Sequence, residues 1–219
     1  MQISQRCGRF ALSLLLVVPV CSLRADKPME ETGFVSLFDG KTLDGWEGKK
    51  EIFSLREGAI VAGSLENPIA NNEFLCTTKI YGDFELRLQA KLVGPGNNAG
   101  IQFRSQRIPN HHEVIGYQCD MGAWKPGVIW GALYDESRRR KMLAEGEQAE
   151  IAKVLKKNDW NDLVIHCQGN RIQIWLNGYR TVNYTEKDAK IATKGIIGLQ
   201  IHGGKPSMAS YRKIRIKPL

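Results

Sequence analysis

Residues 84–92 read FELRLQAKL, from Phe84 to Leu92. Apolar side chains occupy every second position, and charged or amide side chains occupy the positions between them. A period of two is typical of a β-strand with one buried face and one polar face. Residues 171–176 (RIQIWL) alternate in the same way. Asn177-Gly178 follows them and predicts a two-residue hairpin turn, because both central positions of such a turn need positive φ.

Segments with strand character continue along the whole chain. Further strands are expected at residues 34–38, 52–55, 59–62, 74–77, 100–105, 114–121, 128–134, 163–168, 181–184, 196–202 and 211–217. Only residues 147–155 (EQAEIAKVL) predict a helix, and it is short. Many strands, frequent glycines and a single helix favour an all-β antiparallel β-sandwich. Residues 26–219 have a suitable length for one such domain.

The first 25 residues have the layout of a secretory signal peptide. Arg6 and Arg9 precede an apolar run over residues 10–20, and Ala25 offers a small residue at a cleavage point before Asp26. The run is too short for a comfortable membrane span, although an uncleaved anchor is the alternative. We therefore expect a periplasmic or secreted protein with no stable membrane span after cleavage.

The net charge limits the kinds of partner that we expect, and the cysteine content indicates the state of the thiols. The formal net charge is +8, and removal of residues 1–25, with three arginines and no acids, leaves +5. The densest basic run, residues 138–141, lacks interleaved aromatic residues and follows two acids, so we predict a solvated loop and no nucleic-acid partner. Cys76, Cys119 and Cys167 lie in separate strand-like segments and are expected to be buried free thiols.

Three of the expected strands carry pairs of polar residues two positions apart. The pairs are Gln102 with Arg104, Gln118 with Asp120, and Gln200 with His202. A strand sends residues i and i+2 to the same face, so each pair is expected to project together from one sheet. Amide, carboxylate, guanidinium and imidazole groups on one sheet face predict a lined groove that can hold a sugar.

In combination, these segments resemble the 3-keto-disaccharide hydrolase domain family. The resemblance runs in order through LFDGKTLDGW (37–46), YGDFELRLQAKL (81–92), NNAGIQFRS (97–105), GYQCDMG (116–122), GALYDESRRR (131–140), WNDLVIHCQGNRIQIWLNG (160–178) and GIIGLQIHGG (195–204). It implies a concanavalin A-like jelly roll with a carbohydrate groove on its concave sheet. It also implies an exported enzyme that acts on glycosides already oxidised to a ketone at C3.

The implied substrate changes the catalytic groups that are needed. A C3 ketone acidifies the C2 proton, so one base can remove it; the C1 leaving group departs by β-elimination, and water adds back. Many family members carry a glutamate at or beside Gln118, whereas an amide cannot act as a base. We therefore expect Asp120 or His202 as the base and Arg104 as the electrostatic stabiliser. Gln102, Gln118 and Gln200 are expected to bind sugar hydroxyls.

Ordinary glycosidases use two carboxylates across the scissile bond. Asp120 has no acidic partner at i+4 or i+5 on its own strand, so the sequence disfavours that route. Tyr134 and Glu136 are expected to line the groove, or alternatively to end a strand. Trp124 or Trp130 is expected to stack on a sugar face, with packing in the core or at the rim as the alternative.

Other assignments also have structural alternatives. His202 is alternatively a buried, hydrogen-bonded histidine, and Arg104 alternatively pairs with Asp120 or Glu85 to hold the sheet together. His111 and His112 point apart on an extended segment, and only a bent loop would bring one of them to a divalent metal ion in the groove. The alternative function is a non-catalytic carbohydrate-binding module on the same sheet face, and a third possibility is an adhesion domain.

Overall fold

The computed structural model describes residues 31–124 and 127–219. The expected signal peptide at residues 1–25 lies outside them. Within the described ranges, no helix is long and apolar enough to cross a membrane.

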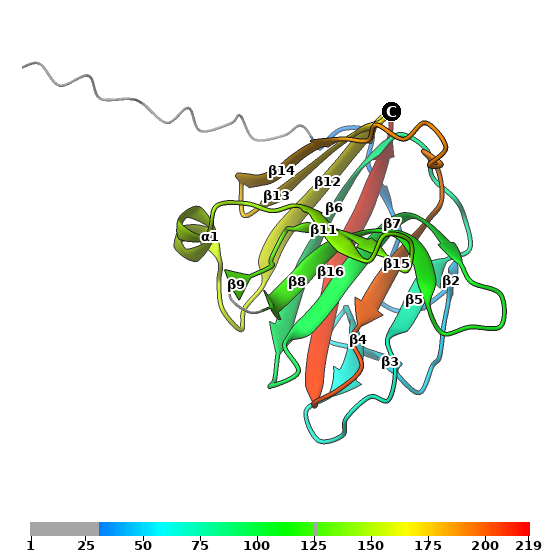
Figure 1. The fold of residues 1–219 in the computed structure, drawn as a ribbon. Coiled ribbons are helices and arrows are strands. Elements are labelled where there is room, and N and C mark those ends of the chain that lie inside the picture. Colours follow the sequence, from blue (N-terminus) through cyan, green and yellow to red (C-terminus); the bar gives the residue numbers. More distant parts are fainter. Residues whose placement is uncertain (1–30, 125–126) are drawn as a thin grey trace, which may run out of the picture. The chain divides into compact units, whose positions relative to one another are not determined.

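Two antiparallel sheets of eight strands each make up the fold (Figure 1). The first sheet has the order β14 (Tyr179–Thr185), β13 (Arg171–Leu176), β12 (Asn161–Gln168), β6 (Phe84–Val93), β16 (Ser207–Pro218), β4 (Ala59–Ser64) and β3 (Phe53–Arg56), with β1 (Val35–Ser36) on β16. The second has the order β11 (Lys141–Ala144), β10 (Leu133–Glu136), β8 (Val114–Trp124), β7 (Asn98–Arg107), β15 (Ile196–Ile201), β5 (Glu73–Thr77) and β2 (Trp46–Glu47), with β9 (Gly127–Val128) on β8. The helix α1 (Gln148–Val154) lies beside β9 (Figure 1).

The alternating residues 84–92 belong to β6, at the centre of the first sheet. Its residues alternate between buried apolar and more accessible polar side chains, as the period of two predicts. The hairpin between β13 and β14 is also confirmed, because Asn177 and Gly178 both have positive φ, 48° and 86°. The predicted all-β antiparallel sandwich with one short helix is therefore confirmed.

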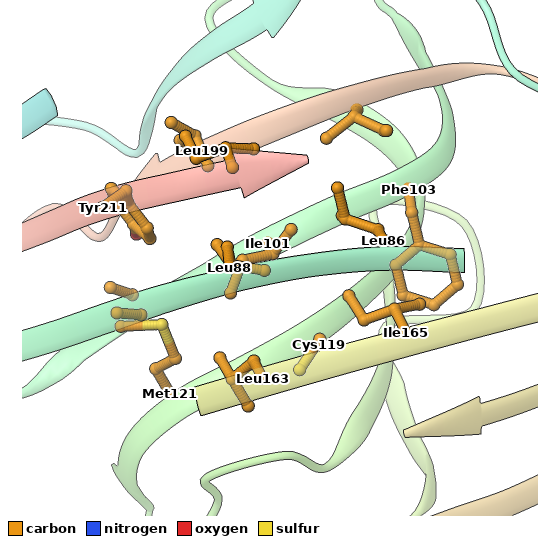
Figure 2. Close-up of a cluster of buried hydrophobic side chains, with 14 of the residues drawn as sticks. Leu86, Leu88, Ile101, Phe103, Cys119, Met121, Leu163, Ile165, Leu199 and Tyr211 are labelled. Atoms are coloured by element: carbon orange, nitrogen blue, oxygen red, sulfur yellow. The ribbon is translucent and has the colours of Figure 1, made fainter. Parts of the chain in front are cut away.

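Apolar side chains from the two sheets meet to form the core (Figure 2). Leu86 and Leu88 of β6 and Leu163 of β12 come from the first sheet, and Ile101 and Phe103 of β7 come from the second. Burial of this apolar surface is the main force that holds the two sheets together.

One buried phenol links the sheets through polar contacts. Tyr211 Oη, from β16, donates toward the carbonyl oxygens of Gln200 at 2.5 Å and Gly100 at 3.2 Å. Those carbonyls belong to β15 and β7, the strands that carry the polar face of the second sheet. Tyr211 of the first sheet therefore ties β7 and β15 of the second sheet in place.

The three cysteines are free and buried, as expected. Burial raises the pKa of the Cys76 and Cys167 thiols to about 12 and raises the pKa of Cys119 as well.

One expected strand, 128–134, is wrong as a continuous element, since β9 ends at Val128 and β10 begins at Leu133. Gly131 turns the chain between them with a φ of 76°, and its N–H donates to Asp120 O at 2.8 Å. The short strands β2 and β11 were not predicted.

Candidate functional site

The polar face of the second sheet is set by the alternation along β8. Tyr117, Cys119 and Met121 enter the core, so Gln118 and Asp120 point to the opposite face. A cavity of about 430 Å³ opens there. It is lined by Asn72, Gly96, Asn98, Gln118, Asp120, Ala123, Trp124, Tyr134, Glu136, His202 and Gly203. Six of the ten predicted site residues therefore meet at one cavity, which we call the acid cavity.

A directed hydrogen-bond chain reaches Asp120 from within the sheet. Gln118 Nε2 donates to Asp120 Oδ1 at 2.5 Å, Gln102 Nε2 donates to Gln118 Oε1 at 2.8 Å, and Ser105 Oγ donates to Gln102 Oε1 at 2.7 Å. In its ionised form Asp120 can only accept, so the carboxylate fixes the orientation of the first amide. That amide then fixes the second in turn. All four side chains are buried, and the hydrogen bonds between them satisfy polar groups that would otherwise be costly to bury.

Gly100 makes room for this chain. A Cβ atom at Gly100 would lie 2.6 Å from Gln118 Cδ, which is closer than real Cβ contacts allow. The Gln118 side chain therefore lies across β7 at the one position that has no side chain. The glycine at this place has a packing role, because Gln118 can reach Asp120 only over a bare backbone.

Asp120 is the most strongly perturbed carboxyl group of the cavity. It is only 3% exposed, and burial raises its pKa to about 8. The Gln118 hydrogen bond acts in the opposite direction, and the nearby Glu136 charge adds to the increase. A carboxyl group with a pKa near neutrality can gain or lose a proton at working pH, as a general acid or base must.

The neighbouring strand β10 brings two more groups to the acid cavity. Tyr134 is the Cα partner of Gln118, and Glu136 lies two residues further along β10. Burial and the Glu113 charge raise the pKa of Glu136, and burial raises the pKa of Tyr134. Asp120 has no acidic partner on its own strand, and Glu136, which was expected to line the groove, brings the second carboxyl group of the cavity from β10.

His202 lies at the end of β15, on the rim of the acid cavity. It is exposed, so the alternative of a buried histidine is wrong. Its Nδ1 lies 2.6 Å from Gly203 O, and since a carbonyl only accepts, Nδ1 carries the proton. Nε2 is therefore the nitrogen left for a ligand.

Two asparagines that line the acid cavity were missed. Asn72 holds the rim, with Oδ1 accepting from Gly203 N at 3.0 Å and Nδ2 donating to Glu113 Oε1 at 3.2 Å. Asn98 Oδ1 is buried and has no partner within the described residues. Asn98 precedes Gly100 and Gln102 at the spacing of two, so the alternation of β7 could have identified it. Asn72 lies outside the strands and has no such signal.

Arg104 was predicted to share a face with Gln102, and this is wrong. A β-bulge interrupts the pairing of β7 with β8 after Phe103, and Arg104 has a φ of 47°. Its guanidinium instead bonds Asp83 Oδ1 at 2.7 Å and Gly169 O at 2.7 Å, in loops that border the first sheet. Arg104 is therefore a structural residue, and its partner is Asp83 and not Asp120 or Glu85.

Three other predicted ligands do not line the acid cavity. Trp130 belongs to the hydrophobic core, so the alternative of core packing is the correct one for this residue. Gln102 is fully buried behind Gln118, where it supports that residue. Gln200 is also fully buried, and its amide has no hydrogen-bond partner among the described side chains and backbone. Trp124, by contrast, is 54% exposed at the cavity wall and meets the Tyr134 ring edge-on at 6.1 Å.

The residues do not form a metal site of the kind considered from the sequence. In residues 31–124 and 127–219, no group of three or more His, Cys, Asp or Glu side chains could hold a metal ion. His111 and His112 stack on each other with ring centroids 4.4 Å apart, and His112 Nδ1 lies 3.3 Å from Asn72 O.

Comparison with known proteins gives a family and a fold. Residues 33–217 match the model of a family described as the 3-keto-alpha-glucoside-1,2-lyase-like domain. No match was found among curated proteins. A provisionally assigned glycosyl hydrolase from Parabacteroides distasonis has a similar structure, with a TM-score of 0.65, 18% identity, and coverage of 85% of this chain and 94% of that one.

Two further solved structures share the fold at low identity. The carbohydrate-binding module CBM66 from Bacillus subtilis has a TM-score of 0.60 and 15% identity, over 79% of this chain and 95% of its own. A Bacillus subtilis protein of unknown function with a galectin-like fold has a TM-score of 0.57 and 12% identity, over 80% and 90%. These likenesses confirm the predicted concanavalin A-like jelly roll.

Proposed function

The chain belongs to the 3-keto-alpha-glucoside-1,2-lyase-like family, a carbohydrate-related family, and from this membership we propose that it cleaves 3-keto-glycosides by elimination across C1 and C2. The observation that carries the proposal is the state of Asp120. Its carboxyl group is buried in a cavity, oriented by Gln118 at 2.5 Å, and has its pKa raised to about 8. Binding a sugar needs no such titrating group, whereas proton abstraction does.

In the proposed reaction, the Asp120 carboxylate removes the proton from C2. The electron pair of the C2–H bond forms a C2=C3 double bond, and the C3 carbonyl oxygen becomes an oxyanion. The oxyanion then reforms the C3 carbonyl, a C1=C2 double bond forms, and the C1–O bond breaks so that the aglycone leaves with the electron pair and takes up a proton. Addition of water across C1=C2 completes a net hydrolysis.

The other lining residues have complementary roles in this proposal. With Nδ1–H held by the Gly203 carbonyl, His202 presents Nε2 at the cavity rim, where it accepts a hydrogen bond from a sugar hydroxyl. Glu136 holds a proton more readily than an ordinary glutamate, because burial raises its pKa, and it supplies that proton to the leaving oxygen. Asn98 and Gln118, which line the cavity, orient sugar hydroxyls.

Two other functions use the same cavity. A non-catalytic carbohydrate-binding module would bind the sugar through the amides and Trp124 alone. A two-carboxylate glycosidase would pair Asp120 with Glu136, both of which line the acid cavity. The elimination route is preferred because the family model describes a 3-keto-alpha-glucoside-1,2-lyase-like domain.

The experiment that tests the reaction uses a 3-keto-glucoside labelled with deuterium at C2. Proton abstraction at C2 predicts slower aglycone release from the labelled substrate and exchange of the label with solvent. Asp120→Asn should abolish both release and exchange. The matched control is Asp162→Asn, an exposed aspartate on β12. Direct displacement at C1 would leave the label in place.

We also propose that the protein is exported, on the basis of Arg6, Arg9 and the apolar run at residues 10–20. Expression of the full chain in a bacterium should yield a shortened protein outside the cytoplasm that begins at Asp26. N-terminal sequencing measures this directly. Recovery of the full-length chain in the membrane fraction would instead support the uncleaved anchor.

A further inference from the structure

A second cavity, of about 440 Å³, adjoins the acid cavity and shares one residue with it, Trp124. Its lining is Trp124, Gly127, Val128, Ile129, Met142, Glu145 and Gln148. We call it the apolar cavity. The indole of Trp124 is the only exposed aromatic ring among the large hydrophobic side chains that the described residues expose. An exposed ring between two cavities is poised to be covered by a ligand that occupies both.

The sheet register shows how the two cavities are joined. Gln118 on β8 is the Cα partner of Tyr134 on β10, and Tyr134 is the partner of Met142 on β11. One row of residues therefore runs across three strands from the acid cavity to the apolar cavity. Polarity falls along this row, from the amide beside Asp120, through a phenol, to a thioether.

The apolar cavity offers few groups for sugar hydroxyls. Gln148 is its amide side chain, and both of its polar ends are engaged, since Oε1 accepts from Val128 N at 2.8 Å and Nε2 donates to Val128 O at 2.9 Å. A second sugar unit would leave many hydroxyls without partners against Val128, Ile129 and Met142, which is unfavourable. An aromatic group needs none and gains from burial.

The two hydrogen bonds between Gln148 and Val128 also hold one wall of the apolar cavity in place. Gln148 belongs to α1 and fixes β9 by its two hydrogen bonds, and a Cβ atom at Gly127 would lie 2.7 Å from Gln148 Oε1. The helix and β9 therefore form one packed wall. At its rim, the exposed Glu145 carries a negative charge that disfavours anionic aglycones.

We propose that the apolar cavity is the aglycone subsite and that it takes a neutral aromatic group. The glycone then lies in the acid cavity, the glycosidic bond passes beside Trp124, and the aromatic ring packs between Trp124, Val128 and Met142. The assignment of this group as the leaving aglycone rests on the proposed function. Recognition of an aromatic glucoside does not, and it can be measured without chemistry.

The test compares the binding of phenyl α-glucoside and methyl α-glucoside, neither of which carries a C3 ketone. Calorimetric titration of the protein should give a dissociation constant at least tenfold lower for the phenyl compound. Met142→Gln should remove most of this preference and leave the affinity for methyl α-glucoside unchanged. The control is Ile80→Gln, an equally polar change at an exposed apolar residue that lines neither cavity.

Several results would overturn the subsite. These are equal affinity for the two glucosides, a Met142→Gln effect that weakens both equally, or no measurable binding of either. Failure of the proposed function is a separate result, because loss of all turnover on 3-keto substrates would leave the phenyl preference and its dependence on Met142 intact.

Discussion

Gln118 Nε2 lies 2.5 Å from Asp120 Oδ1 and donates a hydrogen bond to it. This bond stabilises the carboxylate, while burial of Asp120 stabilises the neutral acid. Burial wins, so the pKa rises to about 8. Glu136 lines the same cavity from β10, and its charge adds to the increase.

The first prediction concerns the pH dependence of catalysis. If the carboxylate of Asp120 is the base, the rising limb of kcat/KM on a 3-keto-glucoside should lie near pH 8. Gln118→Leu removes the donor that favours the carboxylate, so this rise should move to higher pH. A shift of one unit lowers the rate at pH 7 by about tenfold. A pH–rate profile that moves to lower pH would contradict the assignment.

The second prediction concerns stability. The pKa of Asp120 is raised from 3.8 to about 8 on folding, so the folded state binds more protons between these values and stability falls as pH rises through the window. Asp120→Asn removes this cost. The free energy of unfolding of the Asp120→Asn variant should exceed that of the native protein. The difference should grow from pH 5 to pH 8.5 and reach on the order of a few kcal/mol. Urea denaturation at both pH values measures it, and an advantage that shrinks with pH would refute the argument.

The third prediction concerns Gly100. A methyl group there collides with Gln118 Cδ, so Gly100→Ala should displace the amide from Asp120 and shift the pH–rate profile upward, as Gln118→Leu does. The control is Gly82→Ala, because a Cβ atom at Gly82 meets no atom within 4 Å. If the two alanine variants have the same profile, the close approach at Gly100 has no effect on Asp120.

The fourth prediction separates Arg104 from catalysis. Its buried guanidinium ties β7 to Asp83 and Gly169, so Arg104→Ala should lower the free energy of unfolding by roughly 2–4 kcal/mol. The folded fraction should keep the pH–rate profile of the native protein. Arg180→Ala, an exposed arginine on β14, is the control for loss of charge. Loss of turnover without loss of stability would restore the role first expected of Arg104.

The sequence predicts most of the fold because burial imposes a period of two on each strand, as in β6 and β13. The same rule correctly placed Gln118 and Asp120 on one face. It failed at Arg104, because the bulge after Phe103 reverses the face and depends on pairing with β8.

Other parts of the site depend on contacts between distant segments. Glu136 joins Asp120 through the register of β10 with β8, and Asn72 joins the rim through Gly203. Neither relation leaves a local pattern. Trp124 and Trp130 are six residues apart and alike in sequence terms, yet one is exposed at the cavity and the other is in the core.

The most direct measurement is aglycone release from a 3-keto-glucoside and from its unoxidised parent by the same purified protein. We expect release from the keto substrate alone, lost in Asp120→Asn and retained in Asp162→Asn. Release from the parent as well would contradict it in favour of two-carboxylate hydrolysis by Asp120 and Glu136. If neither compound is cleaved while both bind, the protein is a carbohydrate-binding module and the elimination chemistry is wrong.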